Sequence, residues 1–307
     1  MRRLITVIVF ALTVPACAPA PQGPSAPLAR EQVDAGQGLD ASIARTSVEA
    51  FVRAYASASQ DGGSGLATIV LGPKLEAWAH WLDVLNAEFD GSIVGTPAID
   101  GLSFVAEIDT GRAVGAEVDL AASVAFTFDP SGGQAFERTR SLDGPVTVVK
   151  IGAADWRVLD ATRDGVPMSD GIQVFKSEEQ TDGGVTVRMD SLFMFAPNWQ
   201  FNVVVENRTD HAVQLEPTGV VLLHEAGGSV ARVDGVVTGS LAVIPAHATV
   251  EGLMAYPAQD ASNGRTLAVA YRYGRTLLPF EFPLGGLVKV VPPPAPTTTA
   301  PVAGASS

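Results

Sequence analysis

The chain of 307 residues carries a formal net charge of −13 and contains one cysteine. Its length predicts about two domains, and an apolar fraction of 47% is sufficient for folded cores. The acidic balance argues against binding to nucleic acid or to anionic lipid surfaces, because such binding requires Lys and Arg to neutralise phosphates. One cysteine cannot form a disulfide within the chain, so its thiol needs another explanation.

The N-terminal residues have the pattern of an export signal. Arg2 and Arg3 form a short positive segment, and residues 4–14 are apolar and uncharged. This run is too short for a transmembrane helix, which needs about 20 residues. We therefore expect a targeting segment that is removed from the mature protein.

Cys17 follows a lipobox-like sequence, Val14-Pro15-Ala16. We predict that residues 1–16 are a lipoprotein signal peptide and that Cys17 is acylated on its sulfur, which would anchor the protein firmly to the cell membrane on its extracytoplasmic side. Two alternatives stay open: an ordinary signal cleaved nearby, which would leave a secreted protein, and an uncleaved anchor. The abundance of Ala, Gly, Val and Pro with few lysines is typical of a high-GC bacterium such as an actinobacterium.

Two segments have the composition of solvated, disordered chain. Residues 17–39 are rich in Ala, Pro, Gly and Gln without periodicity, so we expect a flexible tether between Cys17 and the folded part. Residues 291–307 are rich in Pro and Thr and are expected to form a disordered tail. The threonines of this tail either carry O-glycans or stay unmodified, and the sequence allows both.

Residues 40–168 begin with two helical patterns. Apolar side chains recur at helical spacing from Val48 to Tyr55. After a glycine-rich break, a second helix is expected to begin at Pro73, because proline is favoured in the first turn.

Strand patterns follow within the same block. The even positions of residues 114–128 are apolar and the odd positions are mostly small or polar, which predicts a long antiparallel strand with one dry face. A hairpin partner is expected at 134–140, and further strands near 146–150 and 156–160. This order predicts an α+β domain with helices on a curved antiparallel sheet.

Residues 171–290 show only strand patterns, separated by turn sequences such as Asp182-Gly183-Gly184. The strands are expected at 171–176, 185–195, 199–206, 213–215, 220–224, 230–238, 249–256, 267–273 and 277–282. This spacing predicts an all-β, immunoglobulin-like sandwich. Without a disulfide, its core must depend on Trp199, Phe201, Tyr271 and branched aliphatic side chains.

Each folded block resembles a known family. Residues 152–160, with the sequence Gly-Ala-Ala-Asp-Trp-Arg-Val-Leu-Asp, resemble the closing strand of the nuclear-transport-factor-two/SnoaL-like cone, and the resemblance covers about residues 40–168. Residues 203–210 and 244–249 place an Asn-containing turn after one strand and a Pro-led turn before another, which resembles telokin-like immunoglobulin-fold domains of bacterial exported lipoproteins. Neither resemblance implies a particular activity, because both folds host many functions.

Tyr55 and Asp160 are the candidate pocket residues. Catalytic cones of the ketosteroid-isomerase kind use a carboxylate base with Tyr or acid donors inside an apolar pocket. Asp160 shares a strand face with Trp156 and Val158, so it could point towards apolar surroundings with Tyr55 as its partner. The structural alternative places Asp160 at the strand end, paired with a nearby arginine or a backbone donor.

Other chemistry finds little support in the sequence. The four histidines show no metal-binding spacing and no cysteine partner, so we expect no metal and no cofactor. Neither a nucleophile elbow nor a phosphate-binding loop occurs. Trp78 and Trp81 either form part of a docking face or pack in the core, and the core is the simpler use.

The sequence therefore predicts a cell-envelope lipoprotein of two folded modules, attached through Cys17, that acts as a non-enzymatic binding or assembly module with an envelope protein as partner. The alternative is a small-molecule binder or isomerase-like enzyme that uses the interior of the cone.

Overall fold

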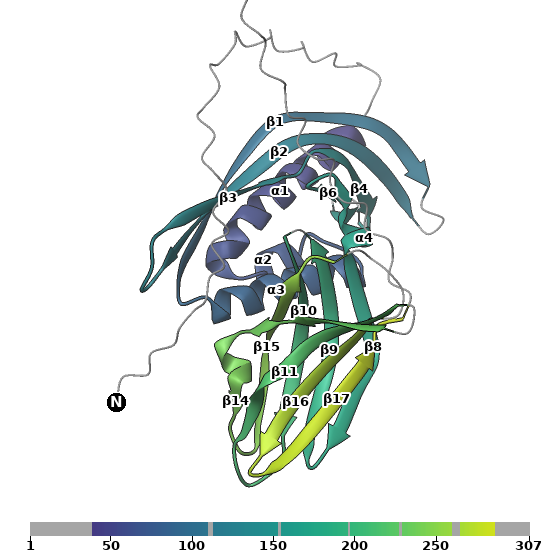
Figure 1. Ribbon diagram of the computed structural model, residues 1–307. Helices are drawn as coiled ribbons and strands as arrows, with labels where there is room; N and C mark the ends of the chain where they lie inside the picture. Colours follow the sequence, from purple (N-terminus) through teal and green to yellow (C-terminus); the bar gives the residue numbers. More distant parts are fainter. Residues whose placement is uncertain are drawn as a thin grey trace, which may run out of the picture.

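The computed structural model describes residues 39–285, apart from 110–112, 153–154, 196, 227–228 and 260–264. Helices and a curved antiparallel sheet come first in the chain, and two further antiparallel sheets follow (Figure 1). The predicted order of an α+β region before an all-β region is confirmed. The predicted signal peptide and C-terminal tail, and the tether as far as residue 38, lie outside the described residues.

The α+β region, residues 39–171, contains α1 (Leu39–Asp61), α2 (Ser64–Ala67), α3 (Pro73–Glu88) and α4 (Met168–Gly171). Its main sheet contains β1 (Gly91–Asp109), β2 (Val114–Pro130), β3 (Phe136–Ser141), β4 (Gly144–Lys150) and β5 (Trp156–Asp160). The sheet order is β1-β2-β4-β5, and β3 pairs with the part of β2 that β4 leaves free. A separate small ribbon consists of β6 (Thr162–Arg163) and β7 (Val166–Pro167).

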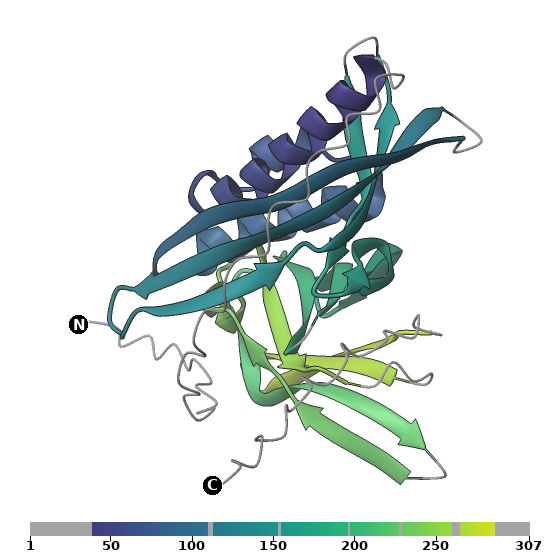
Figure 2. The same cartoon turned by 90° about the horizontal axis from the view of Figure 1, so that it is seen from above.

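The period-two pattern of β2 produces the dry face that it predicts. Its even positions from Ala116 to Phe126 are buried, while Asp119 and Ala121 between them are exposed. Helix α1 lies along this concave face (Figure 2), where the i, i+3, i+4 pattern of Val48, Phe51 and Val52 is fully buried.

Strand β1 is an element that sequence reasoning missed. It pairs with β2 along its length but buries only Ile93, and two register shifts interrupt the pairing. Its glycines and Pro97 are residue types that predict a loop, yet proline and bulges are also typical of an edge strand. Because β1 is an edge strand with little burial, it carries no clear apolar alternation.

The sandwich region, residues 172–285, contains two sheets. One has the order β13-β15-β10-β9-β8 and consists of β8 (Ile172–Asp182), β9 (Val185–Phe195), β10 (Asn198–Asn207), β13 (Val236–Val237) and β15 (Ala248–Pro257). The other has the order β12-β11-β16-β17, with β14 paired to β11, and consists of β11 (Val213–Ala226), β12 (Ser229–Asp234), β14 (Val243–Ile244), β16 (Arg265–Tyr273) and β17 (Thr276–Pro283). A 3₁₀ helix, η1, spans Gly239–Ala242.

The two sheets share one apolar core. Trp199, Phe201 and Tyr271 are buried in it, as the sequence predicts, and come from both sheets. The Tyr271 hydroxyl donates a hydrogen bond of 3.1 Å to the Leu241 carbonyl, so the polar end of this buried ring is satisfied.

Two predicted strand boundaries in this region are wrong. The runs 213–215 and 220–224 belong to one strand, β11, whose register shifts around Pro217. The run 230–238 instead divides into β12 and β13, which belong to opposite sheets. The chain crosses at Gly235, where a Cβ atom would lie 2.5 Å from the Tyr256 ring.

Helix α3 joins the two regions. It lies between α1 and the sandwich (Figure 1), and the Trp81 ring packs against Phe193 of β9 with 5.3 Å between the ring centroids. On the exposed side of this junction, His80 Nε2 lies 2.6 Å from Glu251 Oε1 of β15. The apolar core of the α+β region continues into Phe193, Phe195 and Leu253 of the sandwich, so the two regions share a buried boundary.

Gly95 of β1 lies so close to α1 that a side chain cannot fit there. A Cβ atom would stand 2.4 Å from the Ala56 carbonyl oxygen. We expect Gly95→Ala to lower the free energy of unfolding by about 1–3 kcal/mol, because the helix must move away from the strand. Urea denaturation measures this change.

Gly101 on the same strand is the matched control. A Cβ atom there would meet Ala121 Cβ at an ordinary contact distance of 3.5 Å. Gly101→Ala should change stability by no more than about 0.5 kcal/mol. Equal effects of the two substitutions would show that the α1–β1 approach does not limit this position.

Candidate ligand-binding pocket

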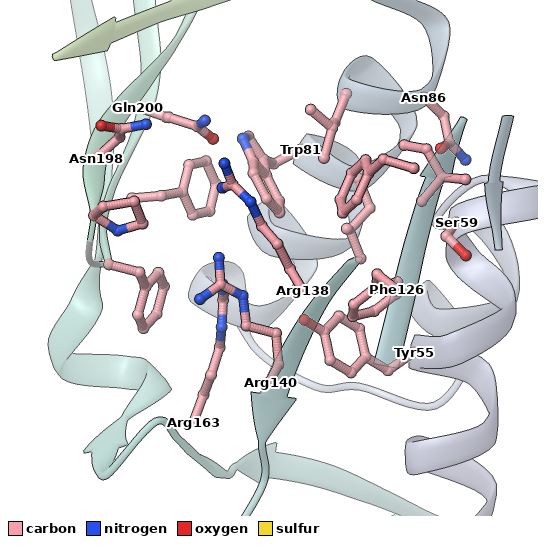
Figure 3. Close-up of a pocket in the computed structure, with 17 residues that line it drawn as sticks. Tyr55, Ser59, Trp81, Asn86, Phe126, Arg138, Arg140, Arg163, Asn198 and Gln200 are labelled. Carbon is pink, nitrogen blue, oxygen red and sulfur yellow. The ribbon is translucent and has the colours of Figure 1, made fainter. Parts of the chain in front are cut away.

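A cavity of about 150 Å³ lies where the concave face of the α+β region meets the sandwich (Figure 3). Helices α1 and α3 and strands β2 and β3 form one side, and the β9–β10 hairpin forms the other. The cavity therefore exists only because the two regions are packed together.

Aromatic side chains from both regions form the walls. Tyr55 of α1 packs edge-on against Phe126 of β2 with ring centroids 5.1 Å apart. Phe128 of β2 also lines the cavity, and Trp81, Phe193 and Phe195 add aromatic rings from α3 and β9. An apolar ligand that removes such a surface from water lowers the free energy of the system, which favours binding.

Two arginines reach the cavity from β3 because of strand alternation. Arg138 and Arg140 occupy alternate positions and so share one face of the strand. In the β2–β3 register they stand opposite Phe126 and Val124, which belong to the dry face of β2. Both arginines line the cavity, and their guanidinium groups point into it in Figure 3.

Arg163 of β6 adds a third guanidinium group. Its side chain is 5% exposed, and Cζ lies 4.5 Å from the centre of the Phe195 ring. Asp164 Oδ2 is 3.5 Å from both Arg163 Nε and Arg140 Nη1. Asp164 is held in place by Ser141, whose backbone N–H donates to Asp164 Oδ1 at 3.1 Å. One carboxylate thus lies between two guanidinium groups.

The pKa directions follow from this crowding. Burial, and next the positive charge of Arg163, lower the pKa of Arg140. Burial raises the pKa of the Tyr55 phenol, and the positive charges of Arg163 and Arg140 oppose that rise. The folded protein therefore disfavours the charged form of Arg140, which is a cost that a bound negative charge would offset.

The structure separates the two candidate pocket residues of the sequence. Tyr55 lines the cavity, whereas Asp160 does not. The Asp160 carboxylate accepts hydrogen bonds from the backbone N–H groups of Ala161 and Ser169, at 2.9 and 3.0 Å, and from the Ser169 hydroxyl at 2.5 Å. It thereby holds the turn into α4 and is not paired with Tyr55.

The other residues that the sequence raised lie as follows. Trp78 is fully buried in the core, and Trp81 is 9% exposed and lines the cavity. Across residues 39–285, with the gaps named above, no group of three or more His, Cys, Asp or Glu side chains is placed to hold a metal ion. Cys17 lies outside the described residues.

Sequence reasoning missed the three arginines, although the signal for two of them was present. The predicted hairpin partner at 134–140 brings Arg138 and Arg140 opposite an apolar face, and charged residues on such a face are unusual. Arg163 carries no such signal, because a β6–β7 ribbon of two short strands has no recognisable periodicity.

Comparison with protein-family models, with curated protein sequences and with solved structures finds no match to this chain. None of the helices within the described ranges has the length and apolar character that crossing a membrane requires. The class of protein is therefore inferred from the fold and the cavity themselves.

If the arginines bind a ligand and do not stabilise the fold, removal of one of their charges should not lower the free energy of unfolding. We expect Arg140→Met to leave the free energy of unfolding unchanged or to raise it by up to about 1 kcal/mol, because the substitution removes repulsion from Arg163 while the side-chain stem still packs. The midpoint of urea denaturation measures the change.

Arg272→Met provides the comparison, since Arg272 pairs with Glu216 on the exposed surface of the sandwich. Exposed pairs contribute about 0–1 kcal/mol, so a small loss is expected there. A loss of more than 1 kcal/mol in Arg140→Met would contradict the prediction and assign Arg140 to the fold.

Proposed function

We propose that this protein is a non-enzymatic, lipid-anchored module of the bacterial cell envelope that binds a small molecule between its two folded regions. The cavity of about 150 Å³ with aromatic walls from both regions is the observation that carries the binding function. Concave, mostly apolar sites with a few polar groups are the usual form of small-molecule sites, and they occur preferentially at boundaries between domains.

The isomerase-like alternative is less well supported. It requires a carboxylate base inside the cavity. The lining that the structure describes contains arginine, amide and hydroxyl groups but no Asp or Glu. Asp160, the carboxylate suggested by the sequence, accepts hydrogen bonds from Ser169 at the turn into α4. We therefore propose binding without catalysis.

The finer fold assignments are proposals as well. For the α+β region, a helix held in the concave face of a curved sheet supports a nuclear-transport-factor-two/SnoaL-like cone. For the sandwich, the orders β9-β10-β15-β13 and β12-β11-β16-β17 correspond to the strand orders A-B-E-D and C′-C-F-G of immunoglobulin-type domains, with β8 as an additional edge strand.

Lipid anchoring rests on the lipobox-like sequence before Cys17. We expect cells that produce the wild-type chain to incorporate a labelled fatty acid into it, and cells that produce Cys17→Ala to incorporate none, because the acyl acceptor is the cysteine sulfur. The variant should also appear in the soluble extracytoplasmic fraction. Equal labelling of both chains would refute the lipoprotein assignment and leave the secreted or uncleaved alternative. An envelope protein partner stays a prediction.

Binding is tested with benzamide, a neutral aromatic probe, followed by isothermal titration calorimetry and saturation-transfer NMR. We expect a dissociation constant of roughly 0.1–1 mM, a magnitude that a ligand of this size reaches in an apolar cavity. Ser59→Phe should abolish binding, because Ser59 lines the cavity on α1 and a phenyl group there would fill it.

The control is Ala121→Phe, which places the same ring on the exposed face of β2. This variant should bind benzamide like the wild type. The unfolding midpoint of Ser59→Phe should not fall, since the ring enters existing space. Equal affinity of wild type and Ser59→Phe for benzamide would refute the proposed site.

A further inference from the structure

We infer that the ligand of this cavity is a carboxylate monoanion on an aromatic or short aliphatic body. This inference rests on the proposed function and specifies its ligand class. Three features of the described residues carry it: unbalanced positive charge, the convergence of three guanidinium groups, and the size of the cavity.

The charge of the lining is strongly positive. Arg138, Arg140 and Arg163 all line the cavity, and Asp164 is the carboxylate within ion-pairing distance of Arg140 and Arg163. Arg138 lies over the Phe136 ring at 5.4 Å, and among the described residues it has no carboxylate within 4 Å. An overall acidic protein thus concentrates positive charge in an apolar cavity, where the low dielectric strengthens attraction to an anion.

The arrangement of the donors favours a carboxylate. In Figure 3 the guanidinium groups of Arg138, Arg140 and Arg163 converge in the middle of the cavity, and the Tyr55 hydroxyl approaches from the side of α1. A guanidinium group matches the planar carboxylate with two parallel hydrogen bonds. A phosphate carries more charge and more acceptors, and the largely apolar walls would leave part of them unsatisfied.

The size of the cavity limits the body of the ligand. A cavity of about 150 Å³ is sufficient for a benzene ring in an engineered protein core. A single ring or a short acyl chain therefore fits beside Tyr55 and Phe126, whereas a long-chain fatty acid would have to extend out of the cavity.

The experiment compares benzoate with benzamide, which has the same shape without the charge, at constant ionic strength by isothermal titration calorimetry. We expect the wild type to bind benzoate at least 10-fold more tightly than benzamide. Phenyl phosphate should bind more weakly than benzoate. Acetate, which lacks an apolar body, should bind more weakly than benzoate and more weakly than phenyl phosphate.

Arg163→Met and Arg140→Met should reduce the preference for benzoate over benzamide to less than about threefold. Arg188→Met, on the outer face of β9, is the control because it removes the same charge away from the cavity. This variant should keep the full preference for benzoate.

Each other outcome has a distinct meaning. Equal binding of benzoate and benzamide by the wild type would overturn the anion inference and leave the proposed binding function standing. Tighter binding of phenyl phosphate than of benzoate would overturn the carboxylate class. An unchanged preference in both Arg140→Met and Arg163→Met would overturn the role of the arginines. Binding of no aromatic probe would overturn both the inference and the proposed function.

Discussion

The packing of α3 against the β9–β10 hairpin is the interaction on which the site depends. Trp81 contacts Phe193 across this boundary, and Phe195 lies beneath the guanidinium group of Arg163. Without the hairpin, the concave face of the α+β region would open to water, and its arginines would be solvated like any others. The sandwich thus supplies the wall that turns a concave face into a cavity.

That wall changes the energetic meaning of the arginines. On an open surface, neighbouring guanidinium groups cost little free energy, because water and salt screen their charges. Beside buried aromatic rings, burial and next the positive charge of Arg163 lower the pKa of Arg140.

The strand and helix patterns were read from the sequence most reliably where one face is fully buried. The alternation of β2 and the apolar stripe of α1 are direct consequences of such burial. Elements with little burial were missed or misplaced: β1 is an exposed edge, and residues 230–238 change sheets at Gly235. Hydrophobic periodicity indicates which face of an element is buried, so it gives no signal where neither face is buried.

For the site, the sequence by itself determined that Tyr55 lies on the apolar face of α1 and that Arg138 and Arg140 share one face of a strand. These features follow from local periodicity. Only the tertiary structure decided that Arg163 and the aromatic rings of β9 meet them, because these residues come from separate segments and are brought together by packing. The tertiary structure also placed Asp160 at a turn, because the backbone N–H and the hydroxyl of Ser169 donate hydrogen bonds to its carboxylate.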